Sequence, residues 1–158
     1  MTADLIKNYT LRISTANRTQ IIVIVYELAD VYLEEALNNI HDKDMESYVD
    51  SCHHAMKCIT HLMNALDDSY ELSDTLRSLY AYMNREISMA AARYDEKRLL
   101  KVKEQVKSLS EAFCELAKAD ASSPIMGNAQ SVYAGLTYGK DSLNESIYDE
   151  GARRGYTV

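Results

Sequence analysis

The stretch TANRTQIIVIVYELADVYLEEA, from Thr15 to Ala36, decides the fold of this 158-residue chain. Its centre, Ile21 to Tyr26, favours a β-strand by composition, because β-branched residues pack well in extended backbone. The apolar positions nevertheless continue one stripe at helical spacing: Ile21, Ile24, Val25, Leu28, Val31 and Tyr32. Asn17 and Gln20 match a capping box at the start of this stripe. We therefore predict that a helix begins at Asn17 and ends near Asn38.

Three further helices are predicted downstream by the same periodicity. The second, capped by Asp42 or Asp44, runs to about Asp67, the third begins near Ser73, and Asp95 opens the fourth. Their apolar faces are Tyr48, Cys52, Ala55, Ile59, Leu62 and Leu66; then Leu76, Leu79, Tyr80, Met83, Ile87 and Ala90; then Leu99, Val102, Val106, Leu109, Phe113 and Leu116. Because short connectors place successive helices antiparallel, the sequence predicts an all-α, up-down-up-down four-helix bundle.

The composition changes near residue 120, where the predicted helical domain ends. One proline and five glycines are few for this length, and they are concentrated after residue 120. We expect residues 1–119 to form the helical domain, with residues 1–16 as an N-terminal cap segment. We predict that residues 120–158 form a flexible tail containing Gly, Ser and Tyr. A capping box at Ser142 and Glu145 predicts one short helix near residues 142–149.

Charge and composition exclude several classes of function. The net charge of -7 argues against nucleic-acid backbone binding as the main task. The longest apolar run is far shorter than the roughly 20 residues that cross a bilayer. No secretory signal is visible, and three cysteines without a disulfide spacing fit a reducing cytoplasm. No phosphate loop, nucleotide fingerprint or nucleophile elbow occurs, so we expect a protein without catalytic residues or cofactors.

One arrangement suits a metal ion. His54, Cys58 and His61 share a helical face at i, i+4 and i+7. A fourth ligand is missing, and solvated histidines beside a buried cysteine explain the pattern more simply. A metal- or ligand-binding helical bundle that uses this face is the alternative interpretation, and the metal content of the purified protein would test it.

The first predicted helix has more apolar surface than one bundle seam uses. A second stripe at the same spacing contains Ile22, Tyr26, Ala29 and Leu33. Either the helix contacts two neighbours, or the stripe lines a groove for an amphipathic partner helix. Tyr82 and Met89, outside the seam of the third predicted helix, favour the groove slightly. Twelve tyrosines against one phenylalanine also suit a surface that is sometimes covered and sometimes wet.

Four dipeptides carry a family resemblance: Thr15-Ala16, Val25-Tyr26, Leu79-Tyr80 and Tyr82-Met83. Over roughly residues 9–119 the chain resembles the flagellin-specific secretion chaperones of the FliS family. One departure is Asn17-Arg18, where the family often has Ser-Pro after the Thr-Ala. Asparagine keeps the helix cap, but the first turn is no longer fixed by proline.

The resemblance implies a function. FliS chaperones bind the C-terminal region of flagellin, their client, one to one in the cytoplasm. They prevent its premature polymerisation and deliver it to the flagellar type III export gate. A flagellar regulatory protein is a further candidate partner, and a purely structural dimerising bundle stays open as another alternative. In the family a segment before the first bundle helix covers part of the client surface and moves on binding. The expected client-binding residues are Tyr9, Ile13, Ile22, Tyr26, Ala29, Leu33, Tyr82 and Met89.

Overall fold

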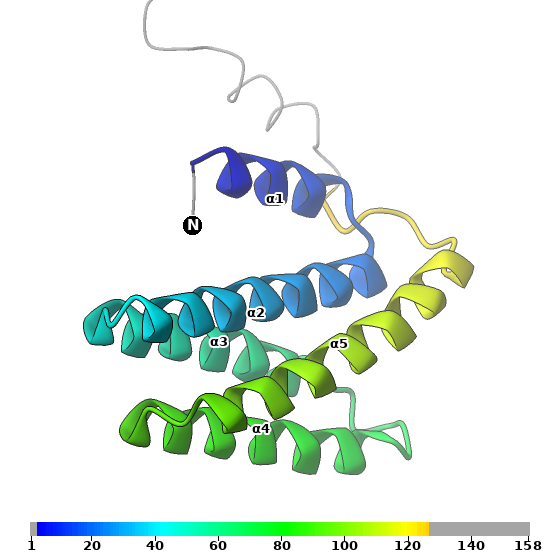
Figure 1. Cartoon of the computed structure of the whole chain (residues 1–158). Helices are drawn as coiled ribbons and strands as arrows, with labels where there is room; N and C mark the ends of the chain where they lie inside the picture. Colours follow the sequence, from blue (N-terminus) through cyan, green and yellow to red (C-terminus); the bar gives the residue numbers. More distant parts are fainter. Residues whose placement is uncertain (1–2, 127–158) are drawn as a thin grey trace, which may run out of the picture. The chain divides into compact units, whose positions relative to one another are not determined.

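The computed structural model describes residues 3–126, which contain five α-helices and no strand (Figure 1). The helices are α1 (Ala3–Thr15), α2 (Arg18–His41), α3 (Met45–Asn64), α4 (Ser73–Arg93) and α5 (Glu96–Ala119). The predicted all-α class is confirmed. The short helix expected near residues 142–149 lies outside the described residues. Within residues 3–126 no helix combines the length and the apolar character that crossing a membrane requires.

The helix starts follow the predicted caps. Asn17 accepts a hydrogen bond from the backbone N–H of Gln20 at 2.8 Å, and the Gln20 side chain accepts from the Asn17 N–H at 2.9 Å. Of the two candidates before α3, Asp44 is the cap, since its carboxylate accepts from the N–H of Ser47 at 3.1 Å. Asp95 caps α5 in the same way. The β-branched run inside α2 is helical, as its surrounding periodicity predicts.

The four long helices, α2 to α5, share one hydrophobic core and are called the helical body below. Helix α2 packs against α3 and α5, and α4 packs against the same two helices from the other side. Helices α4 and α5 lie close where they are joined, and α5 then diverges from α4 toward Ala119 (Figure 1). The largest fully buried side chains are Tyr26, Tyr48, Tyr80, Leu33, Ile59, Met83, Ile87, Leu99, Val102 and Val106.

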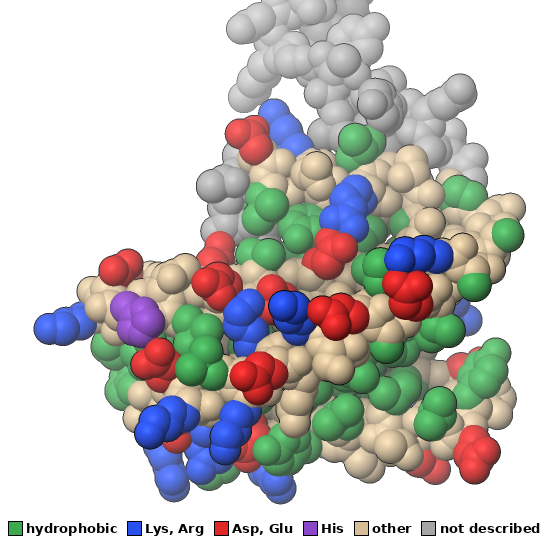
Figure 2. Space-filling model, turned by 45° about the vertical axis from the view of Figure 1, so that its right-hand side comes forward, with side chains coloured by type: hydrophobic (Ala, Val, Ile, Leu, Met, Phe, Trp, Pro, Cys, Tyr) green, Lys and Arg blue, Asp and Glu red, His purple; other side chains and the backbone are tan. Residues whose placement is uncertain are grey.

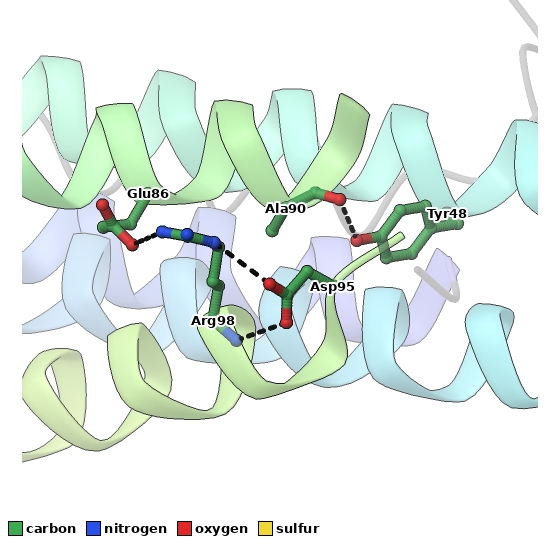
Figure 3. A network of polar contacts seen from close by, with 5 residues as sticks. All are labelled: Tyr48, Glu86, Ala90, Asp95 and Arg98. Carbon is green, nitrogen blue, oxygen red and sulfur yellow. Dashed lines mark hydrogen bonds and ion pairs between the residues drawn. The ribbon is translucent and has the colours of Figure 1, made fainter. Parts of the chain in front are cut away.

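In the core of the helical body, the hydroxyls of the buried tyrosines Tyr26, Tyr48 and Tyr80 all have partners, as burial requires. Tyr26 and Tyr80 form a hydrogen bond to each other between α2 and α4. The Tyr48 hydroxyl donates to the carbonyl of Ala90 at 2.9 Å (Figure 3). Burial raises the pKa of Tyr26 and Tyr48 above the ordinary tyrosine value, so both hydroxyls stay protonated at physiological pH. These three rings therefore fill the core without leaving an unsatisfied polar group.

Helix α1 lies in residues 1–16, which were predicted only as an N-terminal cap segment. Its apolar residues Leu5, Tyr9 and Ile13 recur every four residues and pack with Ala16 against Ile24 and Leu28. Among the helices, α1 contacts α2 alone. Arg12 forms an ion pair with Glu27 of α2, with a second contact of 2.9 Å between Nη2 and Oε1. The N-terminal segment is thus a helix laid along α2 (Figure 1).

Candidate functional site

An apolar pocket of about 580 Å³ opens at the end of the helical body where α5 diverges from α4. It is lined by the start of α2, the end of α3, the connector before α4, the start of α4 and the end of α5. This end lies at the right of Figure 1. The main apolar lining residues are Ile22, Leu62, Leu66, Leu76, Phe113 and Leu116. A cavity of this size and character is typical of a binding site.

Two aromatic side chains join the pocket to the core. Tyr80 and Phe113 both line it, and both rings contact the ring of Tyr26. The centroid distances to Tyr26 are 6.4 Å for Tyr80 and 5.3 Å for Phe113, in tilted geometry. These aromatic contacts hold the inner wall of the pocket in place, because Tyr26 and Tyr80 are almost fully buried.

The rim of the pocket exposes large apolar side chains. Tyr70 and Leu72, in the connector before α4, each keep 69 % of their surface in solvent, and Leu116 of α5 keeps 58 %. Single exposed apolar residues are ordinary on a protein surface, but several around one apolar cavity mark an interaction site. Green side chains accordingly gather toward the right of Figure 2.

Polar groups at the mouth of the pocket are tied to one another. Thr19 donates from its hydroxyl to the Asp120 carboxylate at 2.5 Å, and the N–H of Ser122 donates to the same carboxylate at 2.9 Å. These hydrogen bonds lower the pKa of Asp120, that from Thr19 contributing most. The carboxylate therefore stays ionised at physiological pH and fixes the end of α5 beside the start of α2.

The junction between α1 and α2 also holds the residues just after α5. The side-chain amide of Asn17 donates to the carbonyls of Asp120 at 3.1 Å and Ser122 at 3.4 Å. The N–H of Ile125 donates to the carbonyl of Ala16 at 3.1 Å. Asn17 thus caps α2 with its oxygen and holds residues 120–122 with its nitrogen.

A second candidate surface lies under α1, on the outer face of α2. One cavity of about 410 Å³ lies between α1, α2 and α5, with Ala16, Val23 and Cys114 in its lining. Another of about 380 Å³ lies beside Tyr9 and Val31. Helix α1 therefore covers α2 without filling the space next to it. Because the Arg12–Glu27 pair is partly exposed, it adds little to the stability of this contact.

The structure corrects the expected groove at three of the predicted residues. Tyr26, Ala29 and Leu33 are fully buried in the core of the helical body. The reason is that α2 lies between α3 and α5, so both of its apolar stripes are covered. Of that stripe only Ile22 lines the pocket.

The other predicted residues fall on two separate surfaces. Tyr9 and Ile13 belong to α1 and pack on α2. Tyr82 and Met89 are half-buried on α4, and the Arg85 guanidinium lies 5.5 Å from the centroid of the Tyr82 ring. Tyr70 and Leu72 were not predicted as binding residues, because they lie in a connector without periodicity. Leu116 could have been found, because it belongs to the predicted apolar face of the last helix.

The histidine face of α3 is occupied by other contacts. A ring nitrogen of His54 lies 2.9 Å from the carbonyl of Asp50, and its ring stacks on Tyr32 at 4.9 Å. Burial raises the pKa of the Cys58 thiol to about 11, which disfavours the thiolate that a metal needs. Within the described part of the chain no group of three or more His, Cys, Asp or Glu side chains is placed to hold a metal ion. The metal-binding alternative therefore receives no support.

An open apolar pocket on an all-helical body is typical of proteins that bind apolar segments of other proteins. The comparison with protein families identifies the particular group. The family described as flagellar protein FliS matches residues 3–120, which include all five helices. The chain belongs to the FliS family, a family of flagellar chaperones. A search of curated proteins gave no match.

Proposed function

We propose that this protein is a cytoplasmic export chaperone for flagellin. It binds the C-terminal segment of flagellin, prevents premature polymerisation and delivers the client to the flagellar type III export apparatus. The observation that carries this function is the apolar pocket with Leu72 and Leu116 exposed at its rim, on a body of the FliS family. A flagellar regulatory protein is a further candidate partner.

The pocket suits a client that is apolar before it assembles. A flagellin segment that becomes helical only in the filament exposes leucine and isoleucine side chains beforehand. Burying each of them stabilises the complex by about 1.5–3 kcal/mol. Ordering the segment costs roughly 2–5 kcal/mol, so several side chains must be buried for useful affinity. One pocket cannot hold them all, and a second surface is needed.

The face of α2 under α1 is the proposed second surface. Helix α1 contacts α2 alone and leaves cavities beside it. When α1 moves away, Ile24 and Leu28 lose the cover of Tyr9 and Ile13 and become available to the client. In this proposal α1 competes with the client for the same face of α2.

The proposal treats residues 1–119 as the chaperone domain and residues 120–158 as a tail. It arranges α2 to α5 as an antiparallel four-helix bundle, which their neighbour contacts and short connectors support. Ile22, Tyr82 and Met89 are proposed client contacts. Tyr26, Ala29 and Leu33 support the client surface from inside the core.

The decisive experiment is a calorimetric titration of the full-length protein with the C-terminal segment of flagellin. We expect one-to-one binding and a lag in flagellin polymerisation that grows with chaperone concentration. An N-terminal flagellin segment of equal length is the control and should not bind. Equal binding of both segments, or no effect on polymerisation, would contradict the proposed function.

Displacement of α1 gives a second testable result. Exchanging Tyr9 and Ile13 for serine removes apolar contacts between α1 and α2. No residue of the helical body itself is substituted. We expect flagellin to bind roughly tenfold more tightly, equivalent to about 1.4 kcal/mol, because α1 competes less. Cys114, in the cavity under α1, should be alkylated faster. Cys52 and Cys58 should react slowly in both proteins, because burial raises the pKa of each thiol to about 11.

Ile6 provides the matched control for this experiment. It lies on the same helix but exposes 52 % of its surface. Ile6→Ser should change neither the alkylation rate nor the affinity. If the Tyr9/Ile13 variant binds flagellin equally well or less well, α1 does not compete with the client.

A further inference from the structure

The corner where α4 meets α5 carries exposed cations that no carboxylate within residues 3–126 pairs with. Residues 93–101 contain four cationic and two anionic side chains, in a chain whose net charge is -7. Blue side chains gather at the lower left of Figure 2, at this end of α4 and α5. We call Arg93, Lys97 and Lys101 the basic corner, and all three are exposed.

The two carboxylates within residues 93–101, Asp95 and Glu96, already have cationic or histidine partners. Arg98 pairs with Glu86 and with Asp95, the latter at 3.1 Å (Figure 3). Glu96 lies 3.0 Å from a ring nitrogen of His41. Farther along α5, Lys103 is paired with Asp30 and Glu34. Within residues 3–126 the three cations of the basic corner have no ion-pair partner. Their positive charge is therefore available to attract an anionic ligand.

Apolar side chains lie among these cations. Leu100, between Lys97 and Lys101 in the sequence, exposes 43 % of its surface, and Tyr94 exposes 49 %. Tyr94 adopts left-handed backbone, with φ of 55°, at the position after α4 where glycine is usual. A residue with a Cβ there costs roughly 1 kcal/mol. Its ring contacts Tyr48 at 5.6 Å, so the fold holds an exposed tyrosine at this corner in spite of that cost.

We propose that the basic corner binds an acidic segment of a second protein, one in which aspartate or glutamate alternates with apolar residues. The carboxylates would pair with Arg93, Lys97 and Lys101, and the apolar residues would cover Leu100 and Tyr94. Such mixed contacts give a charged interface both orientation and affinity.

The surroundings of the basic corner favour a short segment over an extended anionic surface. Two exposed carboxylates lie near it. Glu104 is three residues after Lys101 on α5, and Glu46 is two residues before Tyr48, whose ring contacts that of Tyr94. A bilayer or a nucleic-acid duplex reaches farther than the screening length of about 8 Å and would meet these charges. A peptide a few residues long fits between them.

The basic corner and the apolar pocket use opposite halves of α4 and α5. The pocket is lined by residues 72–80, at the start of α4, and by residues 113–119, at the end of α5. The basic corner takes residues 93–101, where the two helices are joined. An acidic segment can therefore bind while the pocket is filled.

The test uses a fluorescent peptide of repeated glutamate-glutamate-leucine triplets and the same peptide with glutamine in place of glutamate. Full-length protein should bind the glutamate peptide at least ~10-fold more tightly than the glutamine peptide. Its affinity for the glutamate peptide should fall as the salt concentration rises. The charge-reversal variant R93E/K97E/K101E should lose at least ~10-fold in affinity for it. Fluorescence anisotropy at several salt concentrations measures both effects.

The matched control is K7E/K57E/K107E, which changes the net charge equally at exposed lysines without an ion-pair partner in the described residues. It should keep the peptide affinity within about twofold. Equal losses in both variants would reduce the effect to net charge and overturn the inference. Corner-dependent binding of phosphatidylglycerol vesicles or duplex DNA in preference to the peptide would overturn it too. The corner variant should still bind the C-terminal segment of flagellin, so failure at one surface is distinguishable from failure at the other.

Discussion

Changing Leu33 to aspartate should prevent the protein from folding, whereas Ile22→Asp should leave it folded and unable to hold flagellin well. Leu33 is fully buried, so the variant loses roughly 2–5 kcal/mol of apolar burial and packing. Burial of an unpaired carboxylate adds to that loss. The total approaches the 5–15 kcal/mol that typically stabilises a domain. Ile22 lines the open pocket, where aspartate can reach water, so its main cost falls on client binding.

A melting curve by circular dichroism and a calorimetric titration with flagellin measure the two effects separately. We expect Leu33→Asp to show no cooperative transition, and Ile22→Asp to melt within a few degrees of the parent, with roughly tenfold weaker binding. Leu33→Met and Ile22→Val are the conservative controls. A well-folded Leu33→Asp protein with weakened binding would show that the second stripe of α2 is a groove after all.

The double variant Leu72→Asp, Leu116→Asp should bind flagellin at least ~100-fold more weakly. Each leucine that the client covers contributes about 1.5–3 kcal/mol, and two together correspond to at least two powers of ten in affinity. Both side chains are more than half exposed in the free protein, at 69 % and 58 %. The thermal stability should therefore change little, because surface substitutions usually stay within about 0.5 kcal/mol.

Leu100 and Ile6 serve as the comparison for this pair. They are also exposed, at 43 % and 52 %, but lie away from the apolar pocket. Leu100→Asp with Ile6→Asp should leave the flagellin affinity unchanged. Equal weakening by both double variants would mean that general surface hydrophobicity, and not the pocket, attracts the client.

Helix type and position could be predicted from the sequence because they depend on local spacing. The β-branched run of α2 is helical because the stripe around it has helical spacing, and Asn17, Asp44 and Asp95 all act as caps. Which part of the protein packs against a helix face cannot be predicted from local spacing. Periodicity shows that Tyr26, Ala29 and Leu33 share one side of α2, but it does not show that neighbouring helices cover that side.

The apolar pocket itself could not be predicted from spacing. It exists because α5 diverges from α4, which is a property of packing between helices far apart in the chain. Its rim residues Tyr70 and Leu72 lie in a connector, where no periodic pattern sets them apart. Helix α1 was missed for a related reason, since Leu5, Tyr9 and Ile13 form a short amphipathic pattern of only about two turns.

The two ends of the Asn17 side chain have a consequence for comparing this protein with its relatives. The oxygen caps α2, and a serine in its place could do the same. The nitrogen reaches the carbonyls of Asp120 and Ser122, which a shorter hydroxyl with one donor could not both satisfy. An alignment that scores asparagine and serine as equivalent caps would therefore overlook a tether. Substitution at this one position should co-vary with the residues directly after the last helix, so relatives are best grouped by both features together.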